Sequence, residues 1–224
     1  MKIIIVSALK EEITFLAKKK NFIKEKKIFH KKIFNKKIIL CKIGIGKTSA
    51  GVNCALLLKK YNPNLIINIG TAGSLNKRLK IGSLIIPNKV CYYDVNMTSF
   101  KQLIGQVEGF PQKFLINSKF FSKTIYFLKK NNLKYITGLS ISGDQFINNK
   151  KKLKKLKKNF SNAISVDMES ASIGQTCYMF KTPFLIIRSI SDFSTKNSHE
   201  IYKKNKKYSI KKCSYLIYKL IKFF

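Results

Sequence analysis

An arginine and an aspartate follow the most apolar segment of the chain, where they could do chemistry together. The run Phe184–Ile187 is followed by Arg188 and, four residues later, by Asp192. Four consecutive apolar residues are typical of a strand buried on both faces of a sheet. Open α/β sheets bind ligands at the carboxyl ends of such strands, although a structural ion pair would give the same pattern. A functional role for this Arg and Asp is favoured over a structural one, because acidic residues and arginines are scarce: the chain has 10 acidic residues and only two arginines.

Half of the acidic residues gather at the ends of three predicted strands. Glu11 and Glu12 follow one strand, Asp167 and Glu169 follow another, and Asp192 ends the strand described above. The helix dipole favours acids in a first helical turn, which is enough to explain one of the two neighbouring glutamates. Lysine dominates the rest of the chain, so a group of acids at strand ends is unusual. The sequence therefore predicts one carboxylate-rich pocket.

Alternating strands and helices must position these acids. Apolar runs predict strands at 2–7, 64–70, 83–87, 89–95, 135–142, 163–166 and 184–187, with hairpin strands from 27 to 41. Helical spacing predicts helices at 49–61, 118–131, 150–158 and 200–222. It also predicts a helix that begins at 11 and another that follows residues 167–170 and ends at 180. Residues 96–116 are expected to form a long loop. This order predicts the α/β class, with a three-layer α/β/α sandwich, and a length of 224 residues fits a single domain, 1–224.

Composition narrows the choice of partners. The net charge of +35 invites a nucleic-acid function. The excess is almost all lysine, which is spread along the chain among Ile, Asn and Phe, as the codons of an AT-rich genome would supply. Because arginine makes the bidentate base and phosphate contacts, we expect no nucleic-acid partner.

We also expect no membrane partner and no metal or cofactor. No apolar run approaches the roughly 20 residues that a membrane span needs, and the C-terminal helix is expected to pack on the sheet. The first apolar segment is interpreted as a strand rather than a leader, which predicts a cytoplasmic protein. Five scattered cysteines and two histidines form no recognisable metal-ligand spacing.

A glycine-rich turn precedes the helix at 49–61. Gly44-Ile45-Gly46-Lys47-Thr48 superficially looks like a phosphate loop, but the required Gly-x-x-x-x-Gly-Lys-[Ser/Thr] spacing is absent, because Cys41 stands at the first position. The segment therefore predicts a tight strand-to-helix turn with a free backbone.

Six segments along the whole chain resemble the 5'-methylthioadenosine/S-adenosylhomocysteine nucleosidases of the nucleoside phosphorylase superfamily. They are Ser7-Ala8-Leu9-Lys10-Glu11-Glu12, Gly44-Ile45-Gly46-Lys47, Asn68-Ile69-Gly70-Thr71-Ala72-Gly73, Ser142-Gly143-Asp144-Gln145-Phe146-Ile147, Val166-Asp167-Met168-Glu169 and Arg188-Ser189-Ile190-Ser191-Asp192. Each segment alone is a weak signal, and six in the family's order make a strong one. The resemblance implies a nucleoside phosphorylase-like fold with a central mixed sheet.

The resemblance implies hydrolysis of an adenine N-glycosidic bond by three acids. Asp192 matches the general acid that protonates adenine N7, a role for which its pKa must be raised. Glu12 matches the general base that activates water, and Arg188 would hold that water and keep Glu12 ionised. Glu169 matches the acid that binds the ribose hydroxyls. Substrates would be methylthioadenosine, adenosylhomocysteine and 5'-deoxyadenosine, and the reaction would serve methionine salvage.

The resemblance also implies a set of recognition residues. Phe146 would stack on adenine, the backbone of Ile147 would bind its edge, and Met168 would pack under the ribose. Gly73 would let the chain approach the ligand, and Ile45 would line the apolar side near the 5'-substituent. The family's pocket is completed across a homodimer, and here Phe100 would be the partner's contribution.

Other functions remain open at this point. A nucleoside phosphorylase shares the fold, but it needs cationic groups for phosphate, and the carboxylate of Glu12 would repel that anion. A related hydrolase that acts on other adenine or hypoxanthine nucleosides is harder to exclude than a phosphorylase. A basic binding protein on a decayed enzyme scaffold is disfavoured, because all three acids are present. Four positions depart from the family. Thr71 stands where Ser is common, and Leu9 stands where Met is more common. Asp167 stands where Glu is usual, and Glu108 stands where the loop often has Pro.

Overall fold

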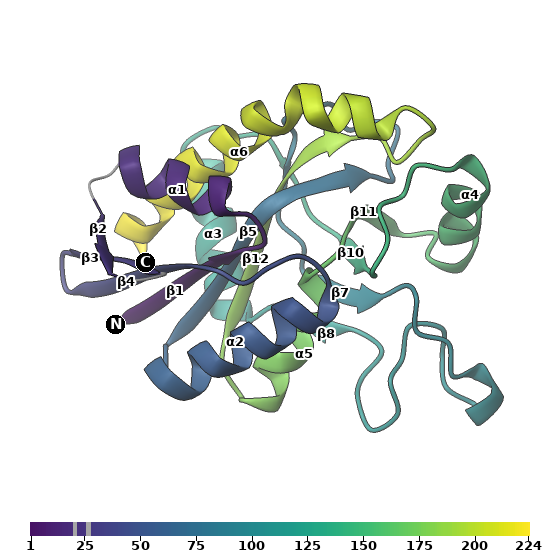
Figure 1. The fold of residues 1–224 in the computed structure, drawn as a ribbon, viewed down its shortest axis with the longest axis horizontal. Helices are drawn as coiled ribbons and strands as arrows, with labels where there is room; N and C mark the ends of the chain where they lie inside the picture. The colour runs from purple at the N-terminus through teal and green to yellow at the C-terminus, as the bar shows by residue number, and fades with distance from the viewer. Residues whose placement is uncertain (20–21, 26–27) are drawn as a thin grey trace.

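The structure is a computed structural model that describes residues 1–19, 22–25 and 28–224. Within these residues, strands alternate with helices along the chain (Figure 1). The strands are β1 Lys2–Ser7, β2 Ile23–Glu25, β3 Ile28–Ile33, β4 Lys36–Lys42, β5 Leu65–Ser74, β6 Leu84–Ile85, β7 Lys89–Tyr92, β8 Phe114–Leu115, β9 Tyr135–Ile136, β10 Leu139–Ser142, β11 Ala163–Asp167 and β12 Phe184–Asp192. The helices are α1 Lys10–Lys19, α2 Lys47–Tyr61, the 3-10 helix η1 Thr98–Phe100, α3 Ser118–Lys130, α4 Lys150–Asn159, α5 Ser170–Met179 and α6 Ser198–Phe223.

Strand β5 is the centre of one mixed sheet. It pairs in parallel with β1 and β12, and its last residues pair in antiparallel with β11. Gly73 is therefore the register partner of both Val166 on β11 and Asp192 on β12. This junction brings the ends of three strands together, as a site at strand ends requires.

Helices cover both faces of the sheet. In Figure 1, α6 and α1 lie above the sheet, and α2 and α5 lie below it. Helices α1 and α3 both contact α6, while α2 contacts α5. The predicted three-layer α/β/α sandwich around a mixed sheet is confirmed.

The core follows the predicted apolar pattern. All nine residues of β12 are buried, including the polar ones at its end. The apolar stripe of α6 is also buried, and α6 packs against β12 and β5. The expectation that the basic C-terminal helix packs on the sheet is therefore confirmed. None of the described helices is both long and apolar enough to span a membrane.

Asparagine side chains cap the N-termini of two helices, α3 and α4. The Asn117 side chain accepts a hydrogen bond from the Phe120 N–H at 3.3 Å at the start of α3. The Asn149 side chain accepts one from the Lys151 N–H at 2.8 Å at the start of α4. Each bond satisfies a helical N–H that has no partner within the helix, which explains the positions of both N-termini.

Several predicted boundaries differ from the structure. Strand β5 continues to Ser74 through the expected glycine turn, because both β11 and β12 pair with that segment. The segment 89–95 is a strand only to Tyr92, and the expected loop 96–116 contains η1 and β8, which pairs with β7. The hairpin expected from 27 to 41 is β3 and β4, and residue 27 lies outside the described residues.

Candidate active site

A cavity of about 340 Å³ lies where β1, β5, β11 and β12 end. Its lining includes Glu12, Glu169, Asp192 and Arg188, which are far apart in sequence. The volume falls at the lower end of the range that small-molecule sites occupy, about 300–1,000 Å³. The structure therefore brings the three predicted acids and the predicted arginine to one ligand-sized space.

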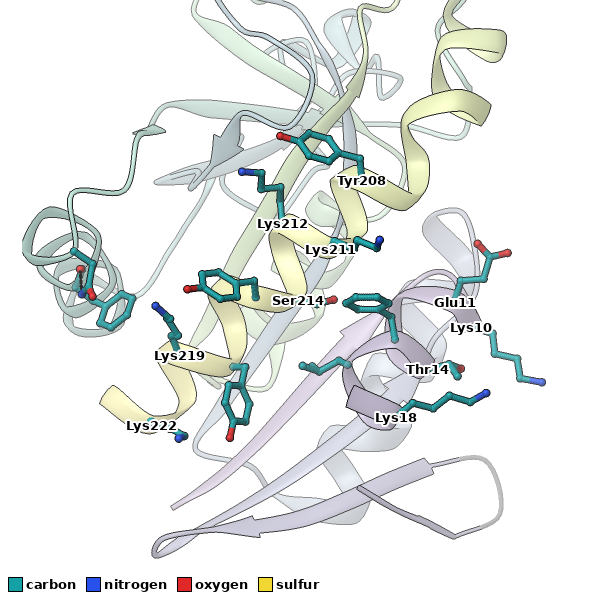
Figure 2. Close-up of a pocket in the computed structure, with 16 residues that line it drawn as sticks. Lys10, Glu11, Thr14, Lys18, Tyr208, Lys211, Lys212, Ser214, Lys219 and Lys222 are labelled. Carbon is teal, nitrogen blue, oxygen red and sulfur yellow. Dashed lines mark hydrogen bonds between the residues drawn. The ribbon is translucent and has the colours of Figure 1, made fainter. Parts of the chain in front are cut away.

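A larger hollow lies elsewhere, between α1 and α6, and has a volume of about 1510 Å³ (Figure 2). Figure 2 shows lysines such as Lys212, Lys219 and Lys222 projecting along α6 on one side of it. Glu11 is the only acid among its described lining residues, and Lys206 pairs with it at 2.7 Å. This hollow is larger than the first cavity, but its lining contains none of Glu12, Glu169 and Asp192, the acids that the predicted chemistry needs.

Glu12 sits on the first turn of α1 with its carboxylate turned inward. The Ser7 hydroxyl donates to Oε2 of Glu12, and the Leu9 N–H donates to the same oxygen at 3.3 Å. Burial raises the pKa of Glu12 above its ordinary value, against the hydrogen bond from Ser7 and the charge of Arg188. Ser7, at the end of β1, and Leu9, just before α1, thus fix Oε2 of this carboxylate. The other oxygen, Oε1, faces β5 at Gly70.

Arg188 is held by a buried polar network. Its Nε donates to Oδ2 of Asp167 at 3.0 Å, and its Nη2 donates to Ser170 Oγ at 2.8 Å and to the Asn68 side chain. Burial alone would raise the pKa of Asp167, but Arg188 and hydrogen bonds from Ser170 and Ser142 together lower it. Asp167, which stands where the family usually has Glu, is thus a buried ion-pair partner of the arginine.

Removing the charge of Asp167 should destabilise the protein strongly. We expect Asp167→Asn to lower the free energy of unfolding by about 3 kcal/mol, because the buried Arg188 would lose its ion-pair partner and keep only neutral hydrogen-bond partners, Asn68 and Ser170. Urea unfolding of both proteins measures the loss. Glu25→Gln is the matched control, since this exposed acid pairs with His30 at 3.4 Å and should change stability by at most about 0.5 kcal/mol. Equal unfolding midpoints for wild type and Asp167→Asn would contradict the structural role given to this pair.

Glu169 lies between β11 and α5, and its carboxylate reaches the turn before α2. The Gly46 N–H donates to Oε1 of Glu169 at 3.1 Å. Burial, together with the nearby negative charge of Asp167, raises the pKa of Glu169 to about 7, although Arg188 opposes this shift. Glu169 therefore changes charge near neutral pH.

This raised pKa predicts a pH-dependent stability. Between the ordinary value of 4.5 and about 7, the unfolded chain loses the Glu169 proton while the folded chain keeps it. The stabilisation present at low pH is then lost as the pH rises. We expect the difference in unfolding free energy between wild type and Glu169→Gln to shift against wild type by about 2 kcal/mol from pH 5 to pH 8. Urea unfolding at both pH values measures it, and a pH-independent difference would contradict the raised pKa.

Asp192 ends β12 and is almost fully buried. The Ser194 N–H donates to Oδ1 at 2.9 Å, and the Ser191 hydroxyl donates to Oδ2 at 3.0 Å. Burial raises the pKa of Asp192 above its ordinary value in spite of these two hydrogen bonds. A carboxyl group held in this way is suited to keep a proton and deliver it.

The predicted recognition residues lie around the same cavity, with one exception. Ile45, Gly73, Phe146, Ile147 and Met168 all line it. A Cβ at Gly73 would lie 3.0 Å from Asp192 Oδ1 and still closer to Ser194 Oγ, so only glycine leaves room there. Ile45 is 54% exposed at the mouth, whereas Ile147 is buried.

Phe100 does not line the cavity of its own chain. It lies on η1, and its side chain is 68% exposed. Its expected contribution to a partner's pocket stays a prediction.

Some functional candidates escaped the sequence analysis. Tyr202 and His199 of α6 line the cavity, and both rings make edge contacts with Phe146. Asn68 and Ser7 also hold the site from inside predicted strands. A polar residue within the run Ile66-Ile67-Asn68-Ile69 is a signal that could have pointed to Asn68.

Comparison with known proteins decides the family. The sequence pattern described as the Phosphorylase superfamily matches residues 2–222. A curated relative from Buchnera aphidicola subsp. Baizongia pistaciae, named 5'-methylthioadenosine/S-adenosylhomocysteine nucleosidase, is 47% identical over 89% of this chain and 81% of its own length. The chain belongs to this nucleosidase family, within the Phosphorylase superfamily. Members of this family are N-ribosyl hydrolases.

Solved structures of the family agree in fold. The nucleosidase from Neisseria meningitidis in complex with methylthio-immucillin-A has a TM-score of 0.93 and 26% identity, covering 100% of this chain and 99% of that chain. The nucleosidase from Colwellia psychrerythraea in complex with adenine has a TM-score of 0.93 and 28% identity, covering 100% of this chain and 95% of that chain. The predicted family and the predicted nucleoside phosphorylase-like fold are both confirmed.

Proposed function

We propose that this chain hydrolyses the N-glycosidic bond of 5'-methylthioadenosine and S-adenosylhomocysteine, and of 5'-deoxyadenosine, to free adenine and the 5'-substituted ribose. The observation that supports this proposal most is the shared cavity of Glu12, Glu169 and Asp192, in a chain of the nucleosidase family. The reaction breaks the bond between C1' of the ribose and N9 of adenine, and it forms a bond from C1' to a water oxygen.

Asp192 protonates the leaving base in this proposal. Adenine departs well only when it carries a proton, and Asp192 would give its carboxyl proton to N7. Burial, which raises the pKa of Asp192, favours the protonated form that the step needs. The Ser194 N–H and the Ser191 hydroxyl fix the orientation of the group and stabilise its carboxylate after the transfer.

Glu12 and Glu169 act on the sugar side. The carboxylate of Glu12, oriented by Ser7 and Leu9, takes a proton from the attacking water, and the charge of Arg188 favours its ionised form. The carboxylate of Glu169 accepts hydrogen bonds from the ribose hydroxyls and stabilises the positive charge that develops at the anomeric carbon. The reaction needs no metal or cofactor in this scheme, because carboxyl groups supply both proton transfers.

The remaining predicted roles complete the proposal. Phe146 stacks on adenine, the backbone of Ile147 binds its edge, and Met168 packs under the ribose. Ile45 lines the 5' side of the pocket. The chain is proposed to act as one domain, residues 1–224, in a cytoplasmic homodimer in which Phe100 completes the partner's pocket, and to serve methionine salvage.

The charges around the cavity favour water over phosphate as the attacking group. Arg188 is the only lysine or arginine among the described lining residues, and Asp167 already pairs with it at 3.0 Å. The Gly46 N–H donates to Glu169 and the Lys47 N–H donates to Asp144, so these two amides at the start of α2 face carboxylates rather than a free anion. A phosphorylase would need cationic groups for its phosphate, and a buried acid such as Glu12 would repel it.

Adenine release in phosphate-free buffer tests the proposal. Purified protein should release adenine from methylthioadenosine, adenosylhomocysteine and 5'-deoxyadenosine, with the same rates after addition of phosphate or of EDTA. Chromatography of the products separates adenine from the sugar. Release that depends on phosphate, with a sugar 1-phosphate as product, would replace hydrolysis by phosphorolysis. Release of hypoxanthine from inosine at a comparable rate would instead indicate a hydrolase of other nucleosides.

A further inference from the structure

We propose that Lys47, Asp94 and Asp144 form a loop clamp, a set of positioning residues that holds two walls of the nucleoside pocket against each other. The inference rests on the proposed function and goes beyond it, since none of the three residues lines the cavity. One wall is the glycine turn 44–46 together with Lys47, the first residue of α2. The other wall is the segment 143–147, which follows β10.

The clamp is a closed set of hydrogen bonds and one ion pair. The Lys47 ammonium lies 2.6 Å from Asp94 Oδ2, and the two side chains are 26% and 27% exposed. The Lys47 N–H donates to Asp144 Oδ1 at 2.7 Å, and the Asp144 N–H donates to Asp94 Oδ2 at 3.0 Å. Charge-assisted bonds of this length are stronger than neutral ones, and each residue bonds to the other two.

The backbone near the clamp leaves little room for other arrangements. Gly46 has a φ of +86°, and a Cβ there would lie 2.9 Å from Asp144 Oδ1. A Cβ at Gly143 would lie 2.8 Å from the Asp94 carboxyl carbon. Glycine at both positions lets the two segments approach closely enough for the clamp to form.

Each wall carries groups that face the nucleoside. On the first wall, Gly46 donates its N–H to Glu169, and Ile45 lines the cavity. On the second wall, Phe146 and Ile147 line the cavity, and the Tyr93 hydroxyl donates to the Gln145 carbonyl at 2.9 Å. A loose clamp would therefore displace the groups that bind the sugar and the base, while Glu12 and Asp192 stay on other elements.

Enzyme kinetics combined with hydrogen exchange test the clamp. We expect Asp94→Ala to raise KM for methylthioadenosine about tenfold, because small displacements of positioning groups weaken binding, while kcat falls less than about threefold. Asp94→Asn, which still accepts from the Asp144 N–H, should give a smaller rise in KM. Amide exchange of 44–48 and 143–147 should become faster in Asp94→Ala than in wild type. Glu25→Ala, the removal of a distant paired acid, should change neither quantity.

The two readouts separate the clamp from the proposed function. Faster exchange confined to the two segments, with the rise in KM, supports the clamp. Unchanged exchange in Asp94→Ala overturns it, whatever the activity, and so does a loss of activity that lies entirely in kcat. If wild type releases no adenine, the proposed function fails, and the exchange result still decides whether Asp94 holds the two walls.

Discussion

Asp192→Asn should lose turnover by about 10³-fold or more while it still binds the nucleoside, as expected for the loss of a general acid. The amide cannot give up a proton to N7, so adenine would have to leave as a poor anionic group. Its NH₂ group can still donate a hydrogen bond to N7, and its size matches the aspartate, which preserves binding. Single-turnover rates of adenine release, with the Kd for methylthioadenosine measured by calorimetry, test both parts.

Ser194→Ala is the control for this prediction. It removes the hydroxyl of a residue that lines the same cavity as Asp192, but it leaves the Ser194 N–H that donates to Asp192. It should retain turnover within about tenfold, because the acid itself is intact. Near-normal rates in Asp192→Asn would remove Asp192 as the acid, and an equal loss of binding and turnover would reduce it to a binding residue.

Glu12→Gln should lose turnover by about 10²- to 10⁴-fold, the range of general base catalysis. Glutamine cannot take a proton from the attacking water, although it keeps the shape of the side chain. The chain supplies a matched control in Glu11→Gln, since Glu11 is the neighbouring acid, lies outside the proposed active site and pairs with Lys206 of α6. This control should leave the rate almost unchanged.

The rate of Glu12→Gln should also lose its dependence on the ionisation of the base. In wild type, we expect kcat/KM to rise with pH as Glu12 ionises, and we expect this limb to disappear in the variant. Equal losses in Glu11→Gln and Glu12→Gln would show that the two acids act only through the charge of α1. A retained limb would assign it to another group, such as Glu169.

Much of the fold could be predicted because the buried strands are almost purely apolar. The runs at β1, the first half of β5 and the first half of β12 can be recognised without their partners, since short, purely apolar runs of this length are typical of strands covered on both faces. The polar residues that follow these runs marked the site, because they come where the strands end. The resemblance of six segments to the nucleosidase family then implied a role for each of these residues.

The long-range pairs could not be predicted. Asp167 and Arg188 meet because β11 and β12 both pair with β5 at Gly73, a topology that local periodicity does not contain. The sequence analysis therefore gave Arg188 a role toward Glu12 only, and missed that Asp167 holds it. The glycine turn before α2 was noted for its free backbone, and its actual partners, Glu169 and Asp144, lie about 100 residues or more away.

The structure of the Asp192→Asn variant with 5'-methylthioadenosine is the most direct test of the central claim, that three distant acids act on one bound nucleoside. The account predicts the nucleoside in the 340 Å³ cavity, with N7 at residue 192, the ribose hydroxyls on Glu169 and a water between Glu12 and C1'. A nucleoside bound outside this cavity, or one in contact with only one of the three residues, would contradict it.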